Sequence, residues 1–255
     1  MTDRCSHPIA AATLVVFLEA ADGGSPEFLM LERSSAMAFA GGALVFPGGR
    51  VDPGDCDFAA AHGLADPDDV AARLAAIRET IEEAGLPIGL TPMPDAATLA
   101  TIRDALANGV PLRNALEPRR IGIDLAALEP FARWRPDHAG MRIYDTRFYL
   151  ARLPDHAPEP SVDATENVRL FWASAGRLLT EAAAGNATLI FPTRRTLERL
   201  SRYPDHAAAV ADARAFPIRL ITPWIQDRNG VPHLCIPDDL GYPVTAELLT
   251  SVRRG

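Results

Sequence analysis

The stretch G48-G49-R-V-D52-P-G-D55, followed after a spacer by R78-E79-T-I-E82-E83-A-G85-L86, decides how this chain folds. Its second half predicts a helix that begins after Asp66, a residue type favoured as an N-cap, with Pro67 at the first helical position. Gly85 is a suitable C-terminal stop. The apolar residues of this helix recur at helical spacing and form one stripe that we expect to face the core, namely Val70, Leu74, Ile77, Ile81 and Ala84.

Three carboxylates, those of Glu79, Glu82 and Glu83, lie opposite the apolar stripe, on a side of the helix that we expect to face water. Like charges at this spacing repel each other unless a cation lies among them, and Mg²⁺ or Mn²⁺ is the natural candidate for a set of oxygen ligands. An E-x-x-E-E pattern alone is more typical of a solvated acidic face. The preceding loop favours the metal site, because Gly48-Gly49 lets the backbone turn sharply and approach a ligand closely.

Together the two halves resemble the signature of the Nudix hydrolases, G-x5-E-x7-R-E-U-x-E-E-x-G-U, in which U is a bulky apolar residue. Gly49 matches the first glycine, and the second half is matched by Arg78, Glu79, Glu82, Glu83, Gly85 and Leu86. Asp55 stands where the family has its first glutamate, and Thr80 occupies the first U position. The spacer from Cys56 to Ile77 holds 22 residues instead of seven. We expect this insertion to be a tolerated loop before the helix, because extra loop length costs little.

The resemblance implies an α/β fold in which a mixed β-sheet is sandwiched between helices. The family domain would cover residues 10–202 with a helical insertion at 88–128, and a C-terminal extension over 203–255 would contain a β-hairpin at Asn229-Gly230. Elsewhere the pattern predicts strands at 13–18, 28–31, 131–134, 143–153 and 166–172, and helices at 95–106, 111–116, 174–184 and 193–200.

The resemblance also implies roles for individual residues. The metal ligands would be Glu79, Glu82, Glu83 and a carbonyl of Gly48 or Gly49. Glu82 or Glu83 is the expected base, with Glu166 as the alternative, since a glutamate before the corresponding strand often serves this purpose in the family. Arg78 lies one turn before Glu82 and would orient it through an i,i+4 ion pair. The expected substrate-binding residues are Arg33, Gly48, Gly49, Arg50 and Arg147.

The run L-M-L-E-R-S-S-A-M-A-F-A-G-G-A-L-V-F-P-G-G, residues 29–49, narrows the resemblance to the coenzyme A diphosphatases, which carry an R-S motif upstream of F-P-G-G. It is most similar to the branch that includes the mammalian peroxisomal enzyme, which also has an insertion in its signature. This implies metal-dependent cleavage of coenzyme A or acyl-coenzyme A to 3′,5′-ADP and a phosphopantetheine. Two alternatives stay open: another nucleoside diphosphate derivative, such as ADP-ribose or a dinucleotide, and a nucleotide-binding regulator without turnover, which Asp55 alone favours.

Composition agrees with a soluble, cytoplasmic enzyme, and the resemblance implies that its substrate is a small-molecule nucleoside diphosphate. With 255 residues, 48% of them hydrophobic, the chain can bury one substantial core. A formal charge of −8 argues against a nucleic acid or an anionic membrane as partner. Cys5, Cys56 and Cys235 are far apart and show no C-x-x-C spacing, as in a reduced compartment. Residues 10–18 form too short an apolar run to cross a membrane. We expect a monomer or a homodimer.

Overall fold

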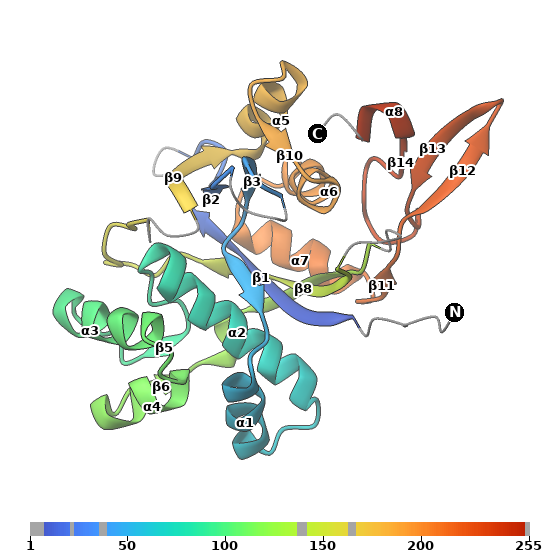
Figure 1. Cartoon of the computed structure of the whole chain (residues 1–255). Coiled ribbons are helices and arrows are strands. Elements are labelled where there is room, and N and C mark those ends of the chain that lie inside the picture. The colour runs from blue at the N-terminus through green and yellow to red at the C-terminus, as the bar shows by residue number, and fades with distance from the viewer. Residues whose placement is uncertain (1–7, 21–22, 36–39, 137–141, 163–166, 253–255) are drawn as a thin grey trace.

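A mixed β-sheet forms the centre of the computed structural model, which describes residues 8–20, 23–35, 40–136, 142–162 and 167–252 (Figure 1). The strand order is β10-β3-β2-β1-β8-β7-β11, with β4 paired to β1 and β9 paired to β2. These strands are β1 (Ile9–Leu18), β2 (Glu27–Arg33), β3 (Ala43–Val45), β4 (Gly48–Arg50), β7 (Glu129–Trp134), β8 (Tyr144–Arg152), β9 (Asn167–Ser174), β10 (Thr188–Leu189) and β11 (Leu220–Ile221).

Strand β1 is the axis of this sheet. It runs parallel to β8 along its whole length, from Ile9 opposite Tyr144 to Phe17 opposite Arg152. Its end pairs antiparallel with the start of β2, so the predicted strands at 13–18 and 28–31 are neighbours in the sheet. Its beginning pairs with β4, so that Gly48 lies opposite Thr13 and Gly49 opposite Ala12. The glycine turn is therefore fixed to a largely buried strand at the centre of the sheet.

Helices cover both faces of the sheet (Figure 1). Side chains of β1 alternate between two hydrophobic clusters, because successive residues of a strand point to opposite faces: Leu14 and Val16 belong to one cluster, and Val15 and Phe17 to the other. The first cluster includes residues of α1 (Pro53–His62), α2 (Pro67–Ala84), α3 (Ala96–Ala107) and α4 (Leu112–Leu116); the second includes residues of α5 (Ala175–Ala183), α6 (Phe191–Leu200) and α7 (His206–Ala215). The predicted sheet between helices is confirmed.

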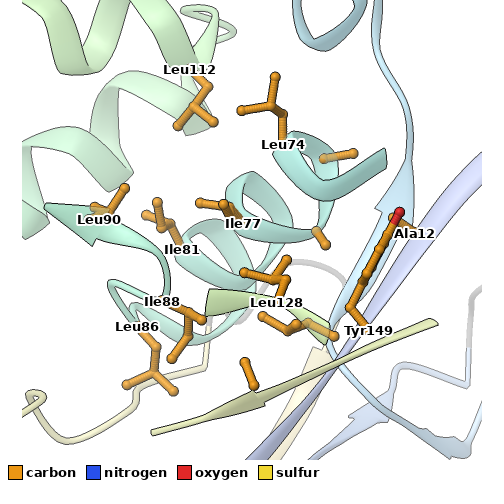
Figure 2. Packing of buried hydrophobic residues seen from close by; sticks show 14 of the residues in the cluster. Ala12, Leu74, Ile77, Ile81, Leu86, Ile88, Leu90, Leu112, Leu128 and Tyr149 are labelled. Atoms are coloured by element: carbon orange, nitrogen blue, oxygen red, sulfur yellow. The ribbon is translucent and has the colours of Figure 1, made fainter. Parts of the chain in front are cut away.

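Helix α2 begins and ends at the predicted residues. The side chain of Asp66 accepts a hydrogen bond from the backbone N–H of Asp69 at 2.9 Å, and Gly85 ends the helix with φ +66°. All five residues of the predicted apolar stripe are buried. Figure 2 shows Ile77 and Ile81 among Leu90 and Leu128 of the insertion, with Tyr149 of the sheet nearby. Burial of apolar area, at about 25 cal/mol per Å², is thus what holds α2 in place.

The part of the spacer before the predicted helix start at Pro67 is not simply an inserted loop, and this prediction was wrong. The first part of the spacer forms most of α1, which Asp52 and Asp55 begin with a reciprocal capping box and Pro53 at the first helical position. The last part of the spacer forms the first turns of α2. The spacer is alanine-rich, and Ala59 of α1 is buried in the same cluster as α2, so that helix formation buries apolar surface that a loop would leave exposed.

The predicted helical insertion at 88–128 is present and packs against α2. Besides α3 and α4 it contains the strands β5 (Leu90–Thr91) and β6 (Gly122–Ile123), which pair with each other, and the 3-10 turns η1 (Glu117–Arg119) and η2 (Leu125–Ala127). The side chain of Asp95 caps α3, close to the predicted start. The insertion extends the core cluster around α2 through Leu99, Ile102, Leu112 and Leu116.

The C-terminal extension is built into the same core. Strand β11 pairs in parallel with β7, and Ala209 and Ala213 of α7 are buried in the second cluster. The predicted hairpin is confirmed by β12 (Trp224–Arg228) and β13 (Val231–Cys235), joined through Asn229 and Gly230 with φ values of +56° and +80°. Strand β14 (Ala246–Leu248) and helix α8 (Leu249–Val252) follow. In the described part of the chain, each helix is too short or too polar to span a membrane.

Candidate active site

The glycine turn and the acidic end of α2 lie against each other, as the sequence predicts. The backbone N–H of Gly48 donates a hydrogen bond of 2.9 Å to Glu83 Oε2. A Cβ atom at Gly49 would lie 2.3 Å from Glu79 Oε1, and one at Gly48 would lie 2.3 Å from the carbonyl oxygen of Ala12. Only glycine therefore lets β4 pass between β1 and the carboxylates of α2.

Arg78 connects the two halves of the signature. Its Nη1 donates to Glu79 Oε1 at 2.9 Å and to Glu82 Oε2 at 3.2 Å, so the predicted i,i+4 ion pair with Glu82 is present. Its Nη2 donates to Asp55 Oδ2 at 3.0 Å and to the carbonyl oxygen of Arg50 at 2.8 Å. Burial alone would lower the pKa of Arg78, but the three carboxylates around it raise that pKa, so the guanidinium stays charged.

Glu83 does not face water, so the prediction that all three carboxylates lie on a water-facing side was wrong for this residue, whereas Glu79 and Glu82 are partly exposed. The helical periodicity locates them opposite the stripe, but β4 and β9 cover that side as well, and Glu83 is only 7% exposed. Burial, reinforced by the repulsion from Glu79, raises the pKa of Glu83 to about 8. Burial likewise raises the pKa of Glu79 to about 7, although Arg78 opposes the shift. The pKa of Glu82 is also raised by burial. Glu79 and Glu83 are thus poised to exchange protons for a cation near neutral pH.

Asn167 is a site residue that the sequence did not reveal. At the start of β9 it is 1% exposed, and its Nδ2 donates to Glu83 Oε1 at 3.1 Å. It lies opposite Arg33 in the β2–β9 pairing, and the charge of Arg33 acts on Glu83, lowering a pKa that burial raises more strongly. The structure therefore brings Arg33 to the carboxylate cluster. The position of Asn167 next to Glu166 was the available signal, and Glu166 itself lies outside the described residues.

Of the remaining predicted substrate-binding residues, Arg50 lies beside the carboxylate cluster and Arg147 does not. Arg50 has an exposed side chain beside the glycine turn, and its carbonyl oxygen is held by Arg78. Arg147 lies elsewhere: its Nη1 donates to Asp69 Oδ1 at 3.1 Å, near the N-terminus of α2. Because Asp69 precedes Glu79 by ten residues, and a helix rises about 1.5 Å per residue, some 15 Å of α2 separate the two positions. The structure does not bring Arg147 to the cluster.

The donor set suits a hard divalent cation, although the ligands are not arranged around one. Within the described residues, no three acidic, histidine or cysteine side chains form a ready-made metal-binding group. Glu79 and Glu82 are turned toward Arg78, and Glu83 toward Gly48 and Asn167. Yet three glutamates converge beside a glycine backbone, and burial raises the pKa of each. Burial destabilises these carboxylates in their charged form, and a hard divalent cation such as Mg²⁺ or Mn²⁺ would compensate for the lost hydration.

The comparison with known proteins finds relatives in one family. No protein-family model matches the chain. The chain is 28% identical to the acyl-coenzyme A diphosphatase NUDT19 of Gallus gallus over an alignment of 238 residues, which covers 68% of this chain and 63% of that relative. It therefore spans less than two thirds of the relative's length. The crystal structure of a Nudix hydrolase from Alicyclobacillus acidocaldarius is similar with a TM-score of 0.67 and 29% identity, covering 81% of this chain and 97% of that one.

Proposed function

From its place in the Nudix hydrolase family, near the coenzyme A diphosphatase branch, we propose that this chain is a metal-dependent diphosphatase that cleaves coenzyme A or acyl-coenzyme A. The products would be 3′,5′-ADP and a phosphopantetheine or its acyl form. One observation carries the proposal: Glu79 and Glu83 of α2 lie against the glycine turn of β4, and Arg78 links Glu82 to Glu79 beside it.

In this proposal Glu79, Glu82 and Glu83 hold the cation, which is Mg²⁺ or Mn²⁺, together with a carbonyl of the Gly48–Gly49 turn. When bound, the cation neutralises charge on the diphosphate and makes a nearby water more acidic. Arg78 orients both Glu79 and Glu82 through one nitrogen, Nη1, which lies 2.9 Å from Glu79 Oε1 and 3.2 Å from Glu82 Oε2. The reaction then depends mainly on positioning and electrostatics.

Glu82 is the proposed base. Its side chain is 25% exposed, so a water molecule can reach it, whereas Glu83 is closed in by Gly48 and Asn167. Glu82 accepts a proton from the water while the water oxygen bonds to one phosphorus and the bridging P–O bond breaks, releasing the other phosphate. Glu83 and Glu166 are the alternative bases. Glu166 precedes Asn167 in the chain, and Asn167 contacts Glu83.

The substrate class is supported by two features. The R-S motif contributes Arg33, whose charge acts on Glu83, and a guanidinium there can bind a phosphate oxygen beside the scissile bond. In addition, the name of the relative from Gallus gallus states acyl-coenzyme A as its substrate. Arg33 and the exposed Arg50 are the proposed contacts of the diphosphate.

The test is a product assay with the purified chain, Mg²⁺ or Mn²⁺, and coenzyme A, acetyl-coenzyme A, ADP-ribose or NADH. We expect 3′,5′-ADP from the two coenzyme A substrates, formed only in the presence of metal, with the highest kcat/KM among the four. Preferential cleavage of ADP-ribose or NADH would instead support the wider nucleoside diphosphate alternative. Micromolar binding of a nucleotide without cleavage of any substrate would favour the non-catalytic regulator.

A further inference from the structure

Helix α2 carries the proposed metal ligands and the proposed base, and is called the catalytic helix below. At its C-terminus, residues outside the helix bind the last carbonyl groups. The last four carbonyls of a helix have no partner within it. In α2 the carbonyl of Ile81 accepts from the N–H of Gly85 at 2.9 Å, and that of Ala84 accepts from the N–H of Ser161 at 2.9 Å. The two between them belong to Glu82 and Glu83, the residues whose carboxylates form the site.

Both of these carbonyls are bound by one side chain from the insertion. Arg103 of α3 donates through Nε to the carbonyl oxygen of Glu82 at 2.9 Å and through Nη2 to that of Glu83 at 3.3 Å. The last turn of α2 carries no basic residue of its own. Arg103 therefore supplies from another element the positive charge that favours a helix C-terminus.

The same guanidinium binds the loop that leads to β9. Arg103 Nη1 donates to Ser161 Oγ at 2.6 Å, and Nη2 donates to the carbonyl oxygen of Ser161 at 2.8 Å. Six residues later Asn167 donates to the carboxylate of Glu83. The chain on either side of residues 163–166 is thus attached to the end of the catalytic helix, once through Ser161 and once through Asn167.

We propose that Arg103 is a positioning residue of the diphosphatase, which fixes the backbone of Glu82 and Glu83 and the approach of the 154–162 loop so that the carboxylates can bind the cation. This inference rests on the proposed function and deepens it. The helical insertion then has a role in the reaction, because Arg103 joins α3, α2 and the loop at one point, without itself contacting the substrate.

The experiment compares the wild-type chain with Arg103→Ala, Arg103→Lys and the control Arg152→Ala. Arg152 is an exposed arginine paired with Asp155 in the same loop, but it does not contact α2 through that pair. Binding of Mn²⁺ alone is measured by the loss of the free-ion EPR signal, and kcat and KM for coenzyme A are measured at a temperature well below each Tm. We expect Arg103→Ala to weaken Mn²⁺ binding and lower kcat by about 10- to 100-fold, as removal of outer-sphere partners does.

In the same experiment we expect KM for coenzyme A to change little, because the contacts of Arg103 are with the backbone of α2 and with Ser161. Arg103→Lys restores part of the Mn²⁺ affinity, since it keeps the charge and one donor. Arg152→Ala stays within about twofold of wild type, as expected for an exposed ion pair. Wild-type Mn²⁺ affinity and kcat in Arg103→Ala, whatever its Tm, would overturn the inference while leaving the proposed function intact.

Two further outcomes can be told apart from a failure of the inference alone. If the wild-type chain binds no Mn²⁺ and cleaves no substrate, the proposed function fails, and the role of Arg103 fails with it. If Arg103→Ala does not fold, Arg103→Gln takes its place, because glutamine is a good helix former and removes the charge and the bidentate reach. Unchanged Mn²⁺ affinity in that variant overturns the inference in the same way.

Discussion

Asp55 Oδ2 lies 3.0 Å from Arg78 Nη2, and both side chains are buried, with 1% and 8% of their surface exposed. The residue that departs from the family signature is therefore bound to the arginine that orients the carboxylates. Asp55→Asn removes one of the three carboxylates around the buried guanidinium and weakens the capping box of α1, so we expect it to lower the free energy of unfolding by about 3 kcal/mol. Urea denaturation would measure this, with Asp57→Asn, an exposed neighbour on the same helix, as the control. Equal midpoints for both variants would contradict the structural role of Asp55.

Gly49→Ala tests the close approach of β4 to α2. Its Cβ would lie 2.3 Å from Glu79 Oε1, so the carboxylate must move away from the turn. We expect Mn²⁺ affinity to fall at least tenfold, about 1.4 kcal/mol. Gly176→Ala, where a Cβ meets nothing within 4 Å inside α5, should instead be neutral or stabilising by up to about 1 kcal/mol. A Gly49→Ala variant that binds Mn²⁺ like the wild type would show that Glu79 is not a ligand.

Glu82→Gln removes the proposed base and keeps the shape of the side chain. We expect kcat to fall by about 10²- to 10⁴-fold with little change in Tm, because the residue is partly exposed and packs no core. Steady-state kinetics with coenzyme A measure the effect, and Glu159→Gln, an exposed carboxylate in the 154–162 loop, is the matched control. Turnover close to wild type would transfer the role of base to Glu83 or Glu166.

The buried carboxylates should make metal-free stability fall as pH rises. Burial raises the pKa of Glu79 to about 7 and that of Glu83 to about 8, from an ordinary value of 4.5. Between those values the folded chain keeps protons that the unfolded chain has lost, so unfolding becomes easier with each step in pH. Below about pH 4.5 both states are protonated and the effect is absent.

A bound cation should oppose this loss of stability at high pH, because it takes the place of the protons on Glu79 and Glu83. We expect the increase in Tm caused by saturating Mg²⁺ to be larger at about pH 8.5 than at about pH 6. Differential scanning fluorimetry at both values measures it. Glu83→Gln should flatten the pH dependence of the metal-free chain; an unchanged slope in that variant would assign the effect to other groups.

Arg33 and Arg147 should behave differently, since only Arg33 is near the carboxylate cluster. We expect Arg33→Ala to raise KM for coenzyme A by roughly tenfold, the value of one charge-assisted hydrogen bond to phosphate. Arg147→Ala should leave KM unchanged and lower stability by no more than about 1 kcal/mol, because Asp69 keeps Arg73 and Tyr149 as partners. A raised KM in Arg147→Ala would contradict its position in the fold.

The sequence predicted those features that depend on local chemistry. The limits of α2 follow from Asp66, Pro67 and Gly85, and the hairpin of the extension from Asn229-Gly230, because caps and tight turns are decided within a few residues. The approach of the glycine turn to the acidic helix was also predicted, because Gly49 and the R-E-x-x-E-E run match the two halves of one signature.

The features that the sequence did not predict depend on contacts between distant segments. Helical periodicity locates Glu83 opposite the apolar stripe, but it does not tell that β4 and β9 cover that side. Asn167 reaches Glu83 only because β9 pairs with β2, a contact between residues more than a hundred positions apart. The first part of the spacer was taken for a loop because α1 has no clear amphipathic pattern of its own and is stabilised by packing on α2.

Helix α1 has a consequence for how relatives of this chain are recognised. The cap at Asp52 and the contact from Asp55 to Arg78 hold the two parts of the motif together across a gap that contains most of α1 and the first turns of α2. The number of residues in the gap is then free to vary between homologues, as long as the helix returns the chain to the same place. A search that requires a constant interval would pass over such proteins, whereas one that asks for an acidic cap on one side and R-E-x-x-E-E on the other would find them.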